Sequence, residues 1–346
     1  MGVRVSFVVI AYNEAGNIGR TLDAITSLAG LDDYEVIVVN DGSRDATADV
    51  VRGRAEGNPR IRLIDLARNR GRGYARSTGI AAAEGELIAT VDADIILPGD
   101  WFARAEEALR GHDHDAVGGT AVPDGDVAYV YQATRLVPRV VGHTTTVTGS
   151  NALYRRQVFD VVGFDPSLRE GEDVALNHAT AGHGLSFGTV PGLLVEHIEN
   201  KSFPGSFRWL FTTGKGATRQ LLVYRQIRVP DLAAGAFVAG LAAGVAVAVL
   251  VNPLGLALPV ALLAAISAQH VRSRFATPLA RWRSVAAAIA IDSALLLAYF
   301  TGRVAGLTWL FRRRPGALAS RAPRTESVGG ARGASPADAS GVTPSR

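Results

Sequence analysis

The chain has 346 residues with 36 basic and 32 acidic side chains, and its formal net charge at pH 7 is +4. It contains no cysteine, which excludes disulfide bonds, thiolate metal sites and a cysteine nucleophile. The length suits two domains, or one domain with an accessory region, and the modest basic excess gives no reason to expect a nucleic-acid partner.

The first part of the chain alternates short apolar runs with helix-like segments. Predicted strands cover residues 3–11, 35–40, 61–66 and 87–91, and predicted helices cover residues 18–28, 45–54 and 75–83. This alternation predicts right-handed parallel crossovers and a doubly wound α/β sheet. No secretory signal is visible, so we expect this part of the chain to stay in the cytosol.

Two carboxylates follow the fourth predicted strand, as Asp92-Ala93-Asp94. Because side chains alternate along a strand, Asp92 and Asp94 should point to the same side. Neighbouring carboxylates repel each other unless a cation lies beside them, and a divalent cation carrying a diphosphate would meet that need. An acidic turn after a strand is the alternative explanation of this motif taken alone.

Polar clusters also follow the other predicted strands, at residues 12–14, 41–43 and 68–73. Ligands of doubly wound sheets bind beyond the carboxyl ends of the strands, so we expect these clusters to meet at one sheet edge. Arg72 and the glycine-rich turn could donate to a phosphate, and Asp41 could accept from a base or a ribose. A tight turn with solvated arginines is an equally good explanation of residues 68–73.

Five motifs, VVIAYNEAGNI, VNDGSRDAT, RGRGYARSTGI, VDADI and GEDVAL, occur in this order and spacing. Together they resemble the family 2 inverting glycosyltransferases, which have a GT-A fold with a mixed α/β sheet. The resemblance covers roughly the first two-thirds of the chain. The chain departs from the family pattern at Ala11, where a proline is usual, and at Arg72, where a lysine is usual.

The resemblance implies a nucleotide-sugar donor and a divalent cation, Mg²⁺ or Mn²⁺. The residues that it implies for the donor are Ala11, Tyr12, Glu14, Asp41, Arg72 and Asp92. It places Asp92 near the ribose or the metal, and Asp94 on the metal. Some relatives add a histidine after a strand, which would be His197 here, although an ordinary core or surface histidine is the alternative.

The family's catalytic base is the aspartate of a Glu-Asp pair, which is Glu172-Asp173 in this chain. In a single displacement the acceptor oxygen attacks the anomeric carbon, and a base takes its proton. Both carboxylates would also be favourable charges before a helix over residues 174–180, and the two explanations are compatible.

The resemblance also assigns an acceptor-side turn to Gly149, Ser150 and Asn151. These residue types favour plain turns in any protein, which is the alternative explanation.

The composition changes near Pro230. Residues 203–230 mix apolar and basic side chains, which predicts helices lying in a membrane interface. Arg208, Lys215 and Arg219 could bind a lipid-linked phosphate there, or could serve only to anchor the helices.

Uncharged or nearly uncharged segments follow at about residues 231–251, 254–271 and 285–310, and each is long enough to cross a bilayer. Asp292 lies in the third segment, where a carboxylate is costly and needs a partner or a polar cavity. We expect three crossings from a cytosolic start. Three crossings would place the arginines at residues 312–314 outside, against the positive-inside rule, and a re-entrant segment is the alternative.

The sequence thus predicts a cytosolic GT-A catalytic domain over residues 1–202, interfacial helices over 203–230, transmembrane helices over 231–311 and a disordered tail over 312–346. The expected activity is metal-dependent inverting transfer of a hexose from a nucleotide sugar to polyprenyl or dolichyl phosphate, or to a saccharide linked to it, as in N-glycan or cell-surface glycan assembly. A lipid-linked sugar flippase with a nucleotide-sugar-binding domain is one alternative. A synthase of a free polymer is another, which the missing Gln of a Q-x-x-R-W motif disfavours.

Overall fold

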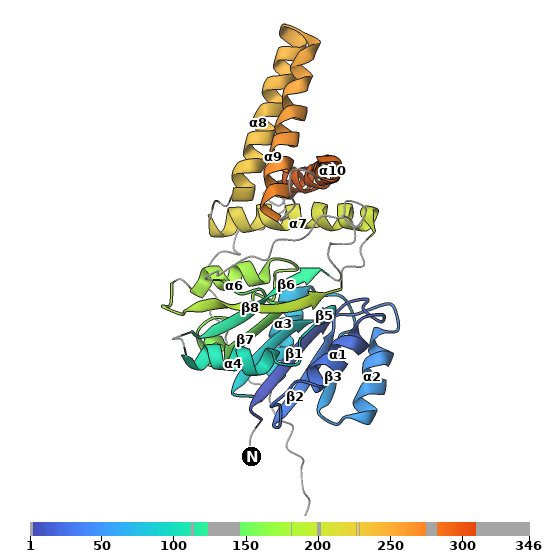
Figure 1. Cartoon of the computed structure of the whole chain (residues 1–346), viewed down its shortest axis with the longest axis vertical. Coiled ribbons are helices and arrows are strands. Elements are labelled where there is room, and N and C mark those ends of the chain that lie inside the picture. Colours follow the sequence, from blue (N-terminus) through green and yellow to red (C-terminus); the bar gives the residue numbers. More distant parts are fainter. Residues whose placement is uncertain are drawn as a thin grey trace, which may run out of the picture. The chain divides into compact units, whose positions relative to one another are not determined.

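Within the described residues, one mixed sheet of eight strands organises the N-terminal part of the chain (Figure 1). The computed structural model describes residues 3–111, 114–123, 146–180, 182–198, 202–225, 227, 229–274 and 282–308. The strands are β1 (Val5–Ala11), β2 (Tyr34–Asn40), β3 (Ile61–Asp65), β4 (Leu87–Asp92), β5 (Ile95–Ile96), β6 (Ala116–Pro123), β7 (Asn151–Arg155) and β8 (Phe187–His197). The four strands predicted in chain order correspond to β1 to β4.

The order of the strands across the sheet is β3-β2-β1-β4-β7-β6-β8-β5. β1 pairs in parallel with β2 and β4, and β2 pairs in parallel with β3, so the carboxyl ends of these strands share one edge. β7 runs antiparallel to β4 and β6, which makes the sheet mixed. The predicted doubly wound mixed sheet is therefore confirmed.

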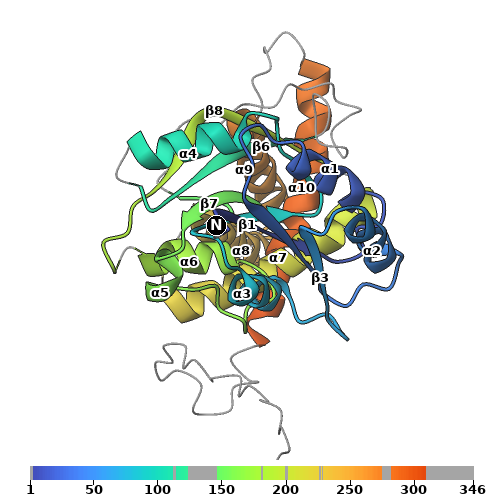
Figure 2. The same cartoon turned by 90° about the horizontal axis from the view of Figure 1, so that it is seen from below.

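Helices cover both faces of this sheet, as the view from below shows (Figure 2). One face carries α1 (Ile18–Thr26), α2 (Thr47–Gly57) and α4 (Trp101–Gly111), and the other carries α3 (Arg72–Ala82), α5 (Val158–Val161) and α6 (Glu172–Thr180). Along β1, Val5, Phe7 and Val9 join the first core, whereas Val8 and Ile10 join the second. A strand buried on both sides reads as a continuous apolar run, which is what the sequence has there.

Two helices begin earlier than the sequence predicts. α3 begins at Arg72 instead of residue 75, because Gly71 has a positive φ of 97° and turns the chain directly into the helix. α6 begins at Glu172 instead of residue 174, so Glu172 and Asp173 occupy its first turn. Acidic side chains interact favourably with the helix dipole at that position.

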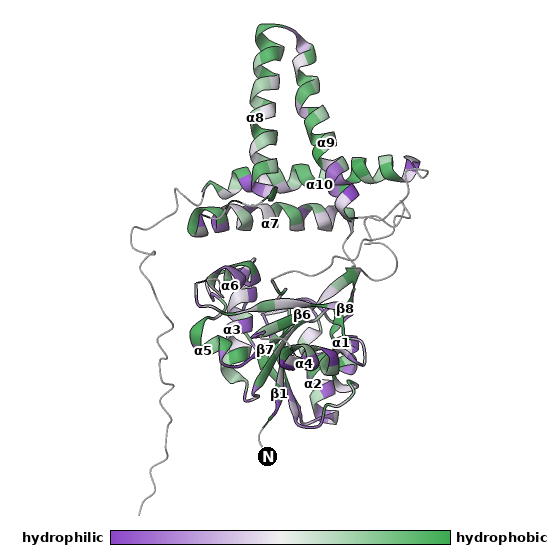
Figure 3. Ribbon diagram, turned by 60° about the vertical axis from the view of Figure 1, so that its left-hand side comes forward, coloured by the Kyte–Doolittle hydropathy of each residue, from purple (hydrophilic) through white to green (hydrophobic). Residues whose placement is uncertain are grey.

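Long helices form the remainder of the described chain: α7 (Phe203–Tyr224), α8 (Val229–Leu250), α9 (Ala257–Arg274) and α10 (Trp282–Gly306), with the short 3-10 helix η2 (Pro253–Leu256) before α9. Where the sequence predicts several interfacial helices over residues 203–230, the structure has one helix, α7. This helix ends where Arg225 takes a left-handed φ of 53°. Among the described residues, Val229–Leu250, Pro253–Ser273 and Trp282–Gly306 are long and apolar enough to cross a membrane (Figure 3). The predicted tail over residues 312–346 lies outside the described residues.

Candidate functional site

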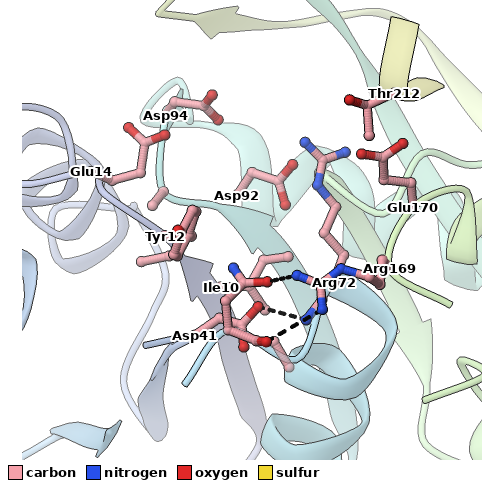
Figure 4. Close-up of a pocket in the computed structure, with 15 residues that line it drawn as sticks. Ile10, Tyr12, Glu14, Asp41, Arg72, Asp92, Asp94, Arg169, Glu170 and Thr212 are labelled. Carbon is pink, nitrogen blue, oxygen red and sulfur yellow. Dashed lines mark hydrogen bonds between the residues drawn. The ribbon is translucent and has the colours of Figure 1, made fainter. Parts of the chain in front are cut away.

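A pocket of about 350 Å³ opens where β1, β2 and β4 end (Figure 4). The strand order predicts this position, since ligands of such sheets bind beyond the carboxyl ends. The pocket is lined by Ile10, Ala11, Tyr12, Glu14, Asp41, Asn69, Gly71, Arg72, Ala75, Asp92, Ala93, Asp94, Arg169, Glu170 and Thr212. The structure therefore brings together all six residues predicted for the donor, and Asp94 with them.

The loops after β1 and β2 hold each other beside the pocket. The N–H of Asn13 donates to Ser43 Oγ at 2.8 Å, and the N–H of Glu14 donates to Thr47 Oγ1 at 2.8 Å. Asn13 Oδ1 in turn accepts the N–H of Arg44 at 2.8 Å. Asn13 has a φ of 58°, in the left-handed region that asparagine tolerates better than most residues. These bonds fix the loop that carries Glu14 at the pocket wall.

The Asp41 carboxylate holds the glycine-rich turn in place. It accepts the N–H of Arg70 at 2.6 Å and that of Gly71 at 2.8 Å. Burial raises the pKa of Asp41, although these two hydrogen bonds oppose the shift. A Cβ on residue 71 would lie 2.5 Å from Arg169 Cα, so glycine is required for this close approach. The Asp41 carboxylate that is predicted to contact a base or ribose is therefore the same group that already supports the turn.

Arg72, the first residue of α3, brings a positive charge to the pocket. Burial disfavours its charged form, but Asp92 and Glu172 outweigh the burial and raise the pKa of Arg72. A guanidinium in this position remains a cation with several N–H donors, which suits a phosphate group.

Behind the pocket wall, Arg76 joins two carboxylates. Its side chain is 1% exposed, and its Nη2 donates to Asp92 Oδ1 at 2.6 Å while its Nε donates to Glu172 Oε1 at 3.0 Å. Burial opposes the charge on Arg76, but Asp92 and Glu172 outweigh it and raise the pKa of Arg76. Sequence reasoning gave Arg76 no role, although it stands in the RGRGYARSTGI motif one helical turn after Arg72.

Asp94 lies beside His197. Asp94 Oδ2 and His197 Nε2 are 3.2 Å apart, because β5 pairs with β8 and brings Ile95 opposite His197. No group of three His, Cys, Asp or Glu side chains able to hold a metal occurs among the described residues. Carboxylate oxygens and an imidazole nitrogen are donors that Mn²⁺ accepts, and cations of this kind commonly complete their coordination with substrate phosphates. The donor types at Asp92, Asp94 and His197 thus fit such a cation.

The predicted base and the acceptor-side turn lie outside the residues that line the pocket. The N–H of Gly149 is 3.5 Å from Asp173 Oδ2. Asn151 is fully buried, and its Oδ1 accepts a backbone N–H of β6 at 2.7 Å. The carbonyl of Ser150 accepts the N–H of Asp92 at 3.1 Å. The turn over residues 149–151 therefore supports Asp92 from behind.

The three α7 cations predicted to contact the acceptor have different surroundings. Arg219 donates to the carbonyl and the hydroxyl of Ser167, both at 3.3 Å. Burial raises the pKa of Glu170, and Lys215 is among the cations that oppose this shift. Arg208 is exposed.

Among the polar side chains of the pocket wall, the sequence analysis gave no role to Arg169, Glu170 and Thr212. Glu170 stands two residues before the Glu-Asp pair, so its position in that acidic cluster was a usable signal. Thr212 belongs to α7 and lies next to Glu170 in the pocket wall (Figure 4). No local pattern predicts that a helix so far along the chain contributes to this wall.

The fold and the pocket edge define a protein with the GT-A architecture. The mannosyltransferase PcManGT from Pyrobaculum calidifontis, solved in complex with GDP-Man and Mn²⁺, aligns with a TM-score of 0.55 and 25% identity over 87% of each chain. Residues 6–163 match the family model described as glycosyl transferase family 2. This segment is therefore similar to a family 2 glycosyltransferase domain, as the five motifs predict.

Curated relatives match the same part of the chain. Succinoglycan biosynthesis protein ExoO of Rhizobium meliloti is 34% identical over 191 residues, which are 50% of this chain and 54% of ExoO. The undecaprenyl-phosphate 4-deoxy-4-formamido-L-arabinose transferase of Aeromonas hydrophila is 30% identical over 204 residues, which are 53% of this chain and 62% of that relative. The chain thus spans between half and two-thirds of the length of these relatives.

Proposed function

We propose that this protein is a membrane-anchored inverting glycosyltransferase, which moves a hexose from a nucleotide sugar to a lipid-linked acceptor. The observation that carries the proposal is the pocket itself. Its wall combines the residues expected to hold a nucleotide sugar with Thr212 of α7, the helix that leads into the apolar spans. A donor bound at the sheet edge would then lie next to an acceptor held at the membrane.

On the donor side, Ala11, Tyr12, Glu14, Asp41, Arg72 and Asp92 would contact the nucleotide sugar. Asp94 and His197, with Asp92 nearby, would hold a divalent cation, Mg²⁺ or Mn²⁺. When bound, the cation supplies positive charge that stabilises the departing diphosphate. The Mn²⁺ in the PcManGT complex supports this choice.

On the acceptor side, Asp173 would take the proton of the attacking oxygen. Glu172 would assist by its ion pair with Arg76. Because Arg76 also pairs with Asp92, it connects the Glu172-Asp173 pair to this donor-side carboxylate. Gly149, Ser150 and Asn151 would border the acceptor, and Arg208, Lys215 and Arg219 would attract its phosphate.

The acceptor class is polyprenyl or dolichyl phosphate, or a saccharide linked to one of them. The name of the Aeromonas relative includes undecaprenyl phosphate, which supports this class. The proposed organisation keeps residues 1–202 as the catalytic domain on the cytoplasmic side of the cell membrane, with α7 at the surface of that membrane.

The flippase alternative depended on Asp292 as a charge in a span. Asp292 Oδ1 pairs with His270 Nδ1 at 2.8 Å, so this carboxylate has the partner that its burial requires. The sugar-transfer proposal is the better supported of the two.

Membranes containing the full chain, a polyprenyl-linked saccharide and radiolabelled UDP-glucose or GDP-mannose would test the proposal, because a saccharide hydroxyl must lose its proton to the base. We expect label to enter the lipid fraction, and Asp94→Ala and Asp173→Asn to reduce the rate by about 10²-fold or more. Asp100→Asn is the control, since Asp100 is exposed and pairs only loosely with Arg104 at 3.8 Å. Wild-type rates in both Asp94→Ala and Asp173→Asn would refute the proposed mechanism.

A further inference from the structure

The helix α10 is long and apolar enough to cross a bilayer, but its contacts point to another position. We propose that α10 lies in the plane of the membrane surface, packed across α7, so that the chain crosses the bilayer only through α8 and α9. This inference rests on the membrane anchoring of the proposed function and is independent of sugar transfer.

The first observation concerns the position of α7. Gln220 Nε2 donates to the carbonyl of Gly171 at 3.0 Å, and Arg219 donates to the carbonyl of Ser167 at 3.3 Å. With Thr212 in the pocket wall, these bonds tie α7 to the catalytic domain over much of its length. A helix that lies along a water-exposed domain cannot also cross the bilayer.

The second observation is that α10 packs closely across α7, and that both helices lie across the foot of the α8–α9 hairpin (Figure 3). A Cβ added to Gly214 would lie 2.2 Å from the carbonyl oxygen of Tyr299, and a Cβ added to Gly302 would lie 2.0 Å from that of Phe211. Further along, Thr218 Oγ1 donates to the carbonyl of Arg303 at 2.8 Å. The contacts are therefore centred on a close crossing near Gly214 and Gly302, which holds α10 against α7.

The third observation is where α10 meets the α8–α9 hairpin. The carboxylate of Asp292 pairs with His270 at 2.8 Å near the end of α9, and Arg303 pairs with Asp231 at the start of α8. Both partners belong to the end of the hairpin away from the turn at residues 251–256. Asp292 and Arg303 are about 16 Å apart along the helix axis, a separation that in a spanning helix would carry one of them deep into the hydrocarbon.

The remaining face of α10 fits an apolar surface. Ala286, Ala290, Leu297 and Val304 recur at helical spacing and are exposed. We identify their partner as the acyl boundary of the leaflet that faces the catalytic domain, because α10 packs against α8 and α9, which also expose large apolar side chains.

Single cysteines can test this topology directly, since the chain has none of its own. Ser27→Cys marks the catalytic domain, Leu254→Cys marks the α8–α9 turn and Ser345→Cys marks the C-terminal segment. Each variant would be labelled with a membrane-impermeant maleimide in right-side-out and inverted vesicles. Residues 27 and 254 must react from opposite sides, which confirms that α8 crosses the bilayer, independently of α10.

We expect residue 345 to react from the same side as residue 27. Reaction from the side of residue 254 would mean that α10 crosses the bilayer, and would overturn the proposal.

Spin labels can then separate an in-plane helix from a re-entrant one. Labels at residues 286, 290, 297 and 304 should report nearly equal depth by their relative accessibility to oxygen and a nickel chelate. Labels on α8 at residues 241, 245 and 249 provide the matched control, because a spanning helix gives depths that change steadily. A steady change of depth along α10 would also overturn the proposal.

Discussion

At the scale of single residues, the charge balance beneath the pocket depends on one guanidinium. Arg76 is almost completely buried and contacts both Asp92 and Glu172. A buried ion pair is weak evidence for stability in itself, but losing one partner leaves an uncompensated buried charge. Arg76 therefore acts as a positioning residue that keeps the donor-side and base-side carboxylates at a fixed separation.

Replacing Arg76 with methionine should lower the free energy of unfolding by about 3–5 kcal/mol, because two carboxylates lose their cation. Thermal unfolding of the purified protein in nanodiscs measures the loss. The double variant Arg76→Met/Glu172→Gln should recover part of it, since one of the stranded charges is removed. Equal stability of the wild type and Arg76→Met would contradict this role for Arg76.

Glu170 predicts a pH dependence of stability. Burial raises the pKa of Glu170 above the ordinary 4.5, so the folded protein binds this proton more tightly than the unfolded chain. The stabilising contribution of protonated Glu170 is fully present below pH 4.5. It is lost as the pH rises through the pKa that Glu170 has in the folded protein. Glu170→Gln lacks that loss, so its melting temperature should exceed that of the wild type increasingly above pH 4.5 and match it below.

Melting curves of both proteins between about pH 4 and pH 8 provide the measurement. A difference that shrinks as the pH rises would show that the sign is wrong, and that the nearby cations stabilise the Glu170 carboxylate on balance.

At the scale of elements, glycines set how closely α7 and α10 approach. Gly214, Gly302 and Gly306 each face backbone or Cβ atoms of the other helix at distances that leave no room for a side chain. Small residues allow helices to pack this closely in and near membranes. The same spacing could have served a pair of spanning helices, so the pattern alone does not decide the position of α10.

Gly302→Ala should destabilise the protein by about 1–3 kcal/mol, because its Cβ would meet the carbonyl of Phe211 and force the helices apart. Gly235→Ala is the matched control, since nothing lies within 4 Å of a Cβ at that position of α8. The control should be neutral or slightly stabilising, because alanine is the better helix former. Thermal unfolding measures both variants, and equal effects would refute tight packing at Gly302.

At the scale of the whole molecule, α7 connects the two halves of the described chain. Its Thr212 belongs to the pocket wall, and its Gly214 and Thr218 contact α10. Movement of α7 relative to the sheet would therefore alter the pocket and the contact with α10 together. In the proposed function, this helix brings a membrane-held acceptor next to a donor bound at the sheet edge.

The sequence alone was sufficient to predict the four parallel strands and the shared position of the residues that follow them. Apolar runs such as residues 87–91 indicate buried strands, and in parallel strands the residues after each run must meet at one edge. This is why the sequence predicts that Tyr12, Asp41 and Asp92 lie in one site. The five motifs added the family, which the match over residues 6–163 supports.

Only the tertiary structure decided which side chains complete that site and where α10 lies. Glu170, just before α6, lines the pocket, whereas Asp173 in the first turn of α6 is not among the lining residues. Thr212 and Arg76 acquire their roles through contacts with residues far away in the chain. The composition of an apolar helix shows that it avoids water. Its direction follows from the helices it packs against, and composition carries no information about those partners.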